Sequence, residues 1–162
     1  MQSYPLTDVG NAVKTLLACV PTDSNAPTLI TAGGTGDNTK MTGQTIDRLG
    51  YDSAALCVGT YADLGADETC AIAAEIQESS NGSSWDSAEE LYASTTASTG
   101  DAGTGSEEWA QKRTAINLRG RKRYVRINVT LNLSRANTDT ANFMAQLVLG
   151  GAEELPVAAQ TA

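Results

Sequence analysis

The sequence predicts an all-β protein: an antiparallel two-sheet β-sandwich, jelly-roll-like in form, preceded by an N-terminal arm or short helix. The first observation is strict alternation over residues 124–133, where five apolar residues alternate with five polar ones. The second is composition, because a chain with 5% aromatic and 19% charged residues, rich in Thr, Ser, Ala and Gly, has little material for helices of Leu, Glu and Lys. The third is a series of short strand-like segments without an amphipathic helix between them after residue 28. A length of 162 residues fits one such domain.

The first twenty residues carry apolar side chains at spacings that suit one face of a helix, with Thr7 or Asp8 available as the N-cap. An extended arm that clamps onto a partner has much the same composition, and its removal is expected to leave the sandwich folded. A proline-bounded turn over 21–27 ends this segment. We therefore divide the chain into an arm or short helix at 1–27, a β-sandwich domain at 28–156 and a tail at 157–162. The residues of the apolar face are Val9, Val13, Leu16, Leu17 and Val20.

A short strand is expected at 28–32, followed by a polar glycine-rich loop at 33–44. This loop resembles a phosphate-binding loop only superficially. A P-loop needs Gly-Lys-Ser/Thr, whereas Lys40 is followed here by Met41. We interpret 33–44 as a surface loop.

The middle of the chain predicts two strands and a turn. Residues 53–59 form a short buried run, and 69–79 alternates as a half-buried strand does. Asn81-Gly82 supplies two residues suited to positive φ in a tight reversal, after which Trp85 is expected on a returning strand. The polar stretch 95–106 is expected to be a mobile or partner-ordered loop.

The last third predicts a hairpin and a final strand. Residues 115–118, a turn at Gly120 and the alternating strand 124–133 together form a hairpin over 115–133. The last strand, 143–150, places Phe143 and every second residue after it on one face.

The residue types exclude several kinds of chemistry. Histidine is absent, so no Ser-His-Asp or Cys-His nucleophile can form and the commonest zinc ligand is missing. No apolar stretch reaches the length of a membrane span, and no secretory signal is recognisable. Three cysteines are an odd number without a C-x-x-C pair, which indicates small buried hydrophobes in a reducing compartment; a Cys57–Cys70 bridge is the alternative.

Acidic residues are plentiful, but most occur as adjacent pairs in polar segments, which is typical of solvated surface. The stretch 101–108 does not have the spacing of an EF-hand calcium loop. We expect no catalytic residues, no metal and no cofactor, and hence no enzymatic activity.

Charge is distributed unevenly along the chain. Residues 109–138 hold eight basic and no acidic residues, whereas the remainder holds three basic and nineteen acidic, for a net charge of −8. This acidity argues against direct nucleic-acid binding. The basic cluster is either a solvated face or a surface for an acidic partner, and Arg126 has the further option of a cross-strand pair with a carboxylate. The candidate protein-interface residues are Arg119, Arg121, Lys122, Arg123 and Arg126.

Trp85 and Trp109 have two interpretations. Exposed tryptophans can be ligand platforms, but in a chain so poor in aromatics the core-anchor interpretation is preferred. Burial of both would argue against carbohydrate binding.

Two resemblances arise from these segments. Residues 76–85, with their Gln-Glu-Ser end and Gly-x-x-Trp turn, together with Arg-Tyr-Val-Arg at 123–126, resemble the sugar-binding, discoidin-like jelly rolls. More of the chain, 45–156, is similar to small head-region virion proteins of tailed bacteriophages. The matching motifs are Ile-Asp-Arg-x-Gly-Tyr-x-Ser-Ala at 46–54, the Gln-Glu-Ser strand end with its Gly-x-x-Trp turn, Gly-x-Lys-Arg-Tyr-Val-Arg at 120–126, and Val-Leu-Gly-Gly at 148–151.

The second resemblance implies a bacteriophage capsid decoration, or cement, protein: a structural β-sandwich that binds the major capsid protein on the outer surface of the virion. It implies a homo-oligomer, dimer or trimer, made in the bacterial host cytoplasm, with no direct nucleic-acid or membrane contact. The alternatives are a carbohydrate-binding module or virion adhesin, and a head-to-tail or tail structural component.

Overall fold

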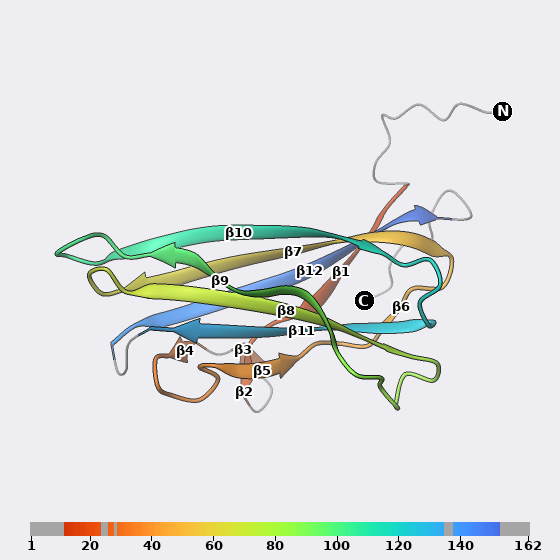
Figure 1. The fold of residues 1–162 in the computed structure, drawn as a ribbon, viewed down its shortest axis with the longest axis horizontal. Coiled ribbons are helices and arrows are strands. Elements are labelled where there is room, and N and C mark those ends of the chain that lie inside the picture. Colours follow the sequence, from red (N-terminus) through yellow and green to blue (C-terminus); the bar gives the residue numbers. More distant parts are fainter. Residues whose placement is uncertain (1–11, 24–25, 28, 135–137, 153–162) are drawn as a thin grey trace.

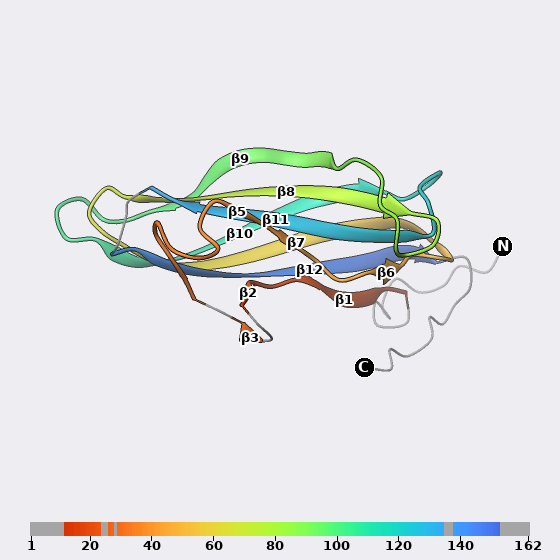
Figure 2. The same cartoon turned by 90° about the horizontal axis from the view of Figure 1, so that it is seen from below.

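The computed structural model describes residues 12–23, 26–27, 29–134 and 138–152, and these residues form only strands and turns (Figure 1). Two antiparallel sheets of five strands each lie face to face, as the view in Figure 2 shows. The predicted β-sandwich is therefore confirmed.

Sheet I contains β1 (Lys14–Cys19), β12 (Thr140–Ala152), β7 (Tyr51–Leu64) and β10 (Ser106–Asn117), with β4 (Ile30–Thr31) paired to β12. Sheet II contains β5 (Thr39–Thr42), β11 (Tyr124–Leu133), β8 (Thr69–Ser79) and β9 (Glu89–Thr99), with β6 (Ile46–Asp47) paired to β11. A small hairpin joins β2 (Thr22–Asp23) to β3 (Ala26–Pro27).

The topology is that of a jelly roll, because the antiparallel pairs are nested. β8 and β9 form the innermost hairpin, β7 pairs with β10 around it, β5 pairs with β11 around those, and β1 pairs with β12 outermost. One long ribbon of paired strands is thus rolled up so that successive pairs alternate between the sheets. The resulting orders, β1-β12-β7-β10 and β5-β11-β8-β9, are those of eight main strands in two interlocked Greek keys.

The core lies between the sheets and is built from the alternate residues of each long strand. Sheet I contributes Leu56, Leu147 and Leu149, all without solvent exposure. Sheet II contributes Ile127 and Leu131, which are also fully buried. The inward faces predicted for strands 69–79, 124–133 and 143–150 are the faces that the structure buries.

Two of the predicted connections are wrong. Residues 115–133 do not form a hairpin, because β10 belongs to sheet I and β11 to sheet II, so the turn at Gly120 crosses between the sheets. Half of the predicted loop at 95–106 is strand: β9 continues to Thr99 and β10 begins at Ser106. β9 is an edge strand with little burial on either face, so its residues carry no apolar alternation.

Smaller differences occur elsewhere. The loop predicted at 33–44 contains β5, which pairs with β11 over Thr39–Thr42. Gly82 has the predicted positive φ of 74°, but Asn81 does not; its Oδ1 instead accepts hydrogen bonds from the Ser83 and Ser84 amides, both at 2.9 Å. Trp85 lies in the connection between β8 and β9 and not on a returning strand.

The N-terminal segment enters the sandwich as a strand. Residues 14–19 form β1, which pairs with β12 and buries Ala18 and Cys19, so the helical alternative is wrong for this stretch. The proposed N-cap at Thr7 or Asp8 lies outside the described residues, as do the ends of the predicted sandwich domain and the tail.

Candidate interaction surfaces

The predicted basic cluster lies at one end of the sandwich. Arg119, Arg121, Lys122 and Arg123 belong to the loop from β10 to β11, and Arg126 lies on β11 itself. The loop is anchored by Leu118, which is fully buried, and it reverses at Gly120, whose φ is 79°. The structure therefore brings the five residues to one region of the surface.

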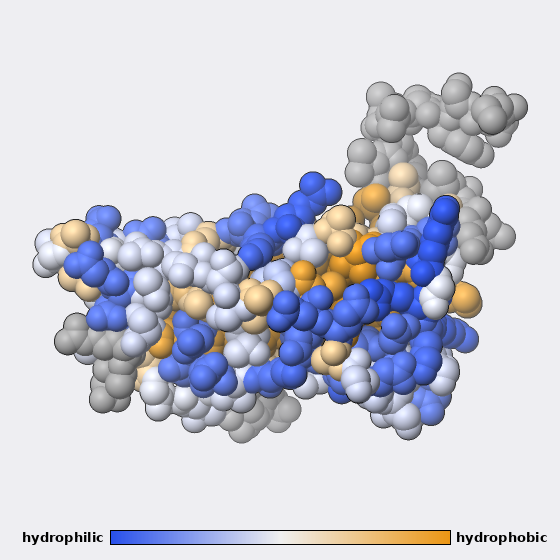
Figure 3. Space-filling view, viewed as in Figure 1, coloured by the Kyte–Doolittle hydropathy of each residue, from blue (hydrophilic) through white to orange (hydrophobic). Residues whose placement is uncertain are grey.

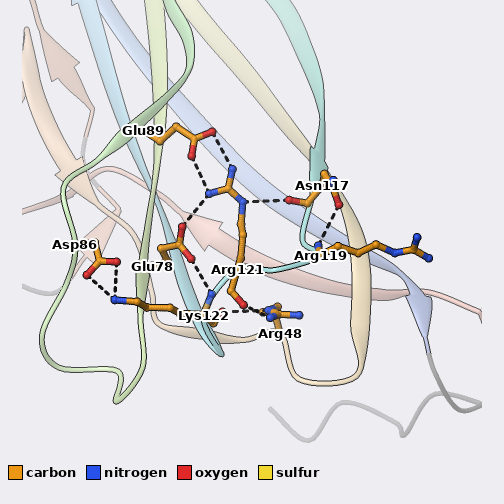
Figure 4. A network of polar contacts seen from close by, with 8 residues as sticks. All are labelled: Arg48, Glu78, Asp86, Glu89, Asn117, Arg119, Arg121 and Lys122. Atoms are coloured by element: carbon orange, nitrogen blue, oxygen red, sulfur yellow. Dashed lines mark hydrogen bonds and ion pairs between the residues drawn. The ribbon is translucent and has the colours of Figure 1, made fainter.

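Arg121 is the centre of a polar network (Figure 4). Its Nη1 and Nη2 atoms donate to the two carboxylate oxygens of Glu89 at 2.9 and 2.8 Å, and Nη1 also donates to Glu78 at 3.2 Å. Its Nε donates to the backbone carbonyl of Asn117 at 3.1 Å. The Arg121 side chain is only 16% exposed, and its hydrogen bonds and then its charge lower the pKa of Glu89 below the ordinary value.

The loop backbone is held from two sides. The amide of Lys122 donates to the second oxygen of Glu78 at 2.7 Å, while its Nζ donates to Asp86 at 2.8 Å. Arg48 donates from Nε to the Lys122 carbonyl at 3.0 Å and from Nη2 to the Arg121 carbonyl. These contacts join the β10–β11 loop to β8 and to the segment after β6, so the network ties sheet I to sheet II.

The outer members of the cluster also have acidic partners in the same chain. Arg119 donates to Asp52 at 2.9 Å, and Arg123 donates through Nε and Nη2 to Asp47 at 3.0 and 2.7 Å. Hydrogen bonding from Arg123 is the largest influence that lowers the pKa of Asp47. Exposed pairs of this kind contribute little stability, and the Arg119 side chain remains 76% exposed.

Among the described residues Arg126 pairs with no carboxylate, so the expected cross-strand ion pair is not formed there. Its Nε donates to Oε1 of Gln77 at 2.9 Å, and its guanidinium lies over the ring of Trp85, 4.3 Å from the centroid. Oε1 of Gln77 also accepts from Asn128 at 2.9 Å. Trp85 is half-buried under Arg126, as an intramolecular cation–π pair.

Four of the five basic residues therefore have acidic partners in their own chain, and of these four Arg121 alone is largely enclosed. Sequence reasoning missed Arg48 as a member, and it missed the carboxylates that complete the network. A signal for them existed in the uneven charge: the acidic residues lie in segments that the sandwich brings to the same end. They are Asp47, Asp52, Glu78, Asp86 and Glu89.

A different surface is exposed on the outer face of sheet I. Trp109, predicted to be a core anchor, is 78% exposed and stacks against Tyr61 with ring centroids 4.7 Å apart and planes tilted by 51°. Beside this pair lies an open depression of about 530 Å³, lined further by Gly59, Phe143 and Met144. Burial of Tyr61 and then the charge of Glu107 raise the pKa of the Tyr61 hydroxyl.

The outer face of sheet II differs in character. Figure 3 shows that the side over β8, β9 and β11 is mostly hydrophilic. On it Lys40 pairs with Glu75 at 2.5 Å, beside the Gln77, Arg126 and Asn128 contacts. The apolar depression thus belongs to sheet I.

Among the described residues, no group of three or more His, Cys, Asp or Glu side chains is placed to hold a metal ion. In the same part of the chain there is no helix long and apolar enough to cross a membrane. The three cysteines are free, so the Cys57–Cys70 bridge is not formed. Burial raises the pKa of Cys19 and of Cys70 to about 11, which makes both thiols unreactive at neutral pH.

No protein-family model matches this chain, and no curated protein matches it. Its fold is similar to chains in several solved structures. In the structure of infectious bursal disease virus Gx strain, the TM-score is 0.48 and the identity 10%, over 89% of this chain and 33% of that one. In the PBSX exported protein XepA, the TM-score is 0.38 and the identity 19%, over 98% and 43%.

A third similar structure contains the CBM22-1 and GH10 modules of Clostridium thermocellum xylanase 10B complexed with xylohexaose. Its TM-score is 0.44 and its identity 14%, over 93% of this chain and 27% of that one. This chain spans about a third of the length of the viral chains that it matches. At identities and TM-scores this low, the likenesses carry no argument about function.

Proposed function

We propose that this protein is a structural component of a tailed-bacteriophage virion that decorates and stabilises the capsid by binding the lattice of the major capsid protein. Its chemistry is binding alone. It acts on the outer surface of the virion, after synthesis in the cytoplasm of the bacterial host, and as a homo-oligomer. Repetition over a lattice reinforces contacts that are individually weak.

One observation supports this proposal above the others. The segments that resemble phage head proteins, 46–54, 77–85 and 120–126, are far apart in the sequence but meet in the network of Figure 4. Arg48 from the first segment and Glu78 from the second both contact Lys122 from the third. The resemblance therefore has one spatial explanation: its polar residues hold one end of the jelly roll together.

The network also restricts how the basic cluster takes part in binding. Arg121 is enclosed, whereas Arg119 and Arg123 lie on the rim with partly exposed side chains. A capsid subunit with an acidic surface is expected to meet these two rim residues and not Arg121. A charged rim of this kind governs the rate and salt dependence of association more than its strength.

Co-sedimentation tests the proposal. Purified protein is mixed with expanded heads that lack it, and bound protein is counted per head across salt concentrations. We expect saturable binding with a copy number set by the lattice, and weaker binding by Arg119→Glu. Lys40→Glu, the same charge change in an exposed ion pair on β5 away from this rim, is the matched control. Absence of binding to heads would refute the decoration role.

Location distinguishes decoration from a head-to-tail or tail component. An image of the native particle should show many copies on the shell. A few copies confined to the portal or tail would contradict decoration and favour the connector alternative.

The exposure of Trp109 favours carbohydrate binding as a second candidate function, in a carbohydrate-binding module or virion adhesin. A tryptophan beside a tyrosine on a sheet face offers apolar ring surface to a sugar. A glycan array with the native protein and Trp109→Ala tests this candidate. Binding lost in Trp109→Ala but kept in Leu49→Ala, which removes another exposed apolar side chain, would support it; an array without hits would remove it.

A further inference from the structure

The outer face of sheet I carries its side chains in rows that run across the strands. Register places Trp109 of β10 beside Tyr61 of β7, and Tyr61 beside Asn142 of β12. The next row, two residues along, contains Gln111, Gly59 and Met144. We call these the aromatic row and the glycine row.

The two rows differ in how far their side chains project from the sheet, and the projecting row is complementary in shape to the flat one. In the aromatic row Trp109 stands 78% exposed above the sheet. In the glycine row Gly59 has no side chain, and a Cβ built there meets no atom within 4 Å, so the floor beside Trp109 is open. A knob and a hole thus lie side by side on one face.

A two-fold axis running across the strands between the rows places the aromatic row of one copy over the glycine row of another. The strands of the two facing sheets are then antiparallel, and each copy inserts its Trp109 and Tyr61 above the other's glycine row. Such an interface is isologous, because the same residues serve on both sides and the assembly closes at two copies.

The charges on the face fit the same operation. Glu107 lies two residues before Trp109 on β10, and Arg113 lies two residues after Gln111. The axis therefore places Glu107 of each copy opposite Arg113 of the other. Both side chains are on exposed positions, and neither forms an ion pair within the described residues.

We propose that this face binds a second copy of the same chain, forming a two-fold dimer with Tyr61 over Gly59, Trp109 over Gln111 and Glu107 opposite Arg113. At the usual strand spacing and rise, β7, β10 and β12 present about 600 Å². Specific interfaces bury about 800 Å² on each partner, so the dimer is expected to be reversible, with a dissociation constant of roughly 1–100 μM. This inference concerns the protein in solution and does not rest on the capsid role.

Sedimentation velocity over a concentration series tests the dimer. We expect the native protein to pass from monomer to dimer within the range of about 1–200 μM. Trp109→Ala removes the knob and Gly59→Leu fills the hole, and each should raise the dissociation constant at least about tenfold. Leu49→Ala is the matched control, because it removes an exposed apolar side chain outside this face.

A charge exchange tests the geometry itself. Glu107→Arg and Arg113→Glu each place like charges opposite one another and should weaken the dimer, while the double variant restores both pairs and should recover it. Circular dichroism and melting of each variant confirm that it is folded. If the native chain remains monomeric throughout the series, or if the double variant is no better than the single ones, the proposed interface is wrong. A monomer that binds glycans through Trp109 would likewise overturn it and assign the face to sugars.

Discussion

Arg121 contributes more to the end of the sandwich than any other member of the basic cluster, because it is enclosed and contacts two carboxylates and a backbone carbonyl. Its removal leaves Glu78 and Glu89 facing each other without a cation. We expect Arg121→Ala to lower the free energy of unfolding by about 2 kcal/mol, measured by urea denaturation.

Arg119→Ala is the matched comparison, since it deletes the same side chain from an exposed pair in the same loop. It should cost less than about 0.5 kcal/mol. Equal losses in the two variants would contradict the central role assigned to Arg121.

The same network predicts how stability depends on pH. Hydrogen bonds from Arg121 and Arg123 lower the pKa of Glu89 and of Asp47 in the folded protein. A carboxyl with a lowered folded pKa contributes stability above its unfolded value, and the contribution disappears as pH falls through the folded value. We expect the melting temperature to drop as pH falls below the ordinary values of 4.5 for Glu89 and 3.8 for Asp47.

A double replacement, Glu89→Gln with Asp47→Asn, provides the control for this pH dependence. It should be less stable than the native protein at neutral pH and should lose less on acidification. An identical acid profile in both proteins would show that other carboxyls govern the transition.

At the residue scale, the sequence predicted positions better than partners. The five basic residues do come together, but their acidic partners lie up to seventy-six residues away in the chain, and only the rolled topology brings them close. The scarcity of aromatics predicts Trp109 in the core, whereas the alternation of β10 places it outside. Ile116 is buried on β10, and Trp109 lies an odd number of residues from it, which already indicates the outer face.

At the scale of elements, Gly43 lies against the backbone of both β11 in sheet II and β1 in sheet I. A Cβ at this position would lie 2.2 Å from the carbonyl oxygen of Ile127 in β11 and 2.3 Å from that of Ala18 in β1. The next residue, Gln44, donates its amide to the same Ala18 oxygen at 2.8 Å. Gly43→Ala must push β1 away from β11, and we expect a loss of about 3 kcal/mol or more in thermal or urea unfolding.

Gly59→Ala is the comparison for this prediction, because its Cβ meets open space. It should change stability by no more than about 0.5 kcal/mol. A similar loss at both positions would mean that the close approach at Gly43 is not what matters.

The presence of β1 within the first twenty residues changes which deletion can test the N-terminal arm. Removing residues 1–20 was expected to leave the sandwich folded, but it deletes β1 and exposes the edge of β12 together with the core beneath Ala18 and Cys19. We expect the chain lacking 1–20 to lose cooperative unfolding, whereas the chain lacking only 1–11 should melt close to the native temperature.

If 1–11 form the clamp, the shorter deletion should weaken binding to heads without lowering stability. Full binding by that folded chain would exclude the clamp.

Strands could be predicted from the sequence where one face is buried and the other is exposed to solvent. The alternation in 124–133 identified β11 to the residue, and 69–79 identified β8. β9 was not predicted, because an edge strand of Thr, Ser and Ala buries too little on either face for apolar residues to recur at every second position. The hairpin assigned to 115–133 failed for another reason: adjacency in sequence does not reveal which sheet a strand joins.

At the scale of the whole molecule, the fold brings part of the basic segment together with acidic residues that are distant in the sequence. Four of the eight basic residues in 109–138 form ion pairs with acidic residues from other segments at one end of the sandwich. An exposed apolar area also lies on sheet I, beside Trp109, and it favours binding through shape complementarity.

The nested ribbon makes a final prediction about the order of folding. The β8–β9 hairpin is the most local pairing, while β1 and β12 pair across nearly the whole chain, so their closure costs the most entropy. We expect refolding in milliseconds to seconds, with the hairpin formed in the transition state and β1 added afterwards. Asn81→Ala, which removes the acceptor for the Ser83 and Ser84 amides, should slow folding with little effect on unfolding. Leu16→Ala on β1, which packs against the core, should instead speed unfolding and leave the folding rate nearly unchanged. Stopped-flow measurements across urea concentrations separate the two rates, and a slowed folding limb in the Leu16 variant would place β1 in the nucleus and reverse the proposed order.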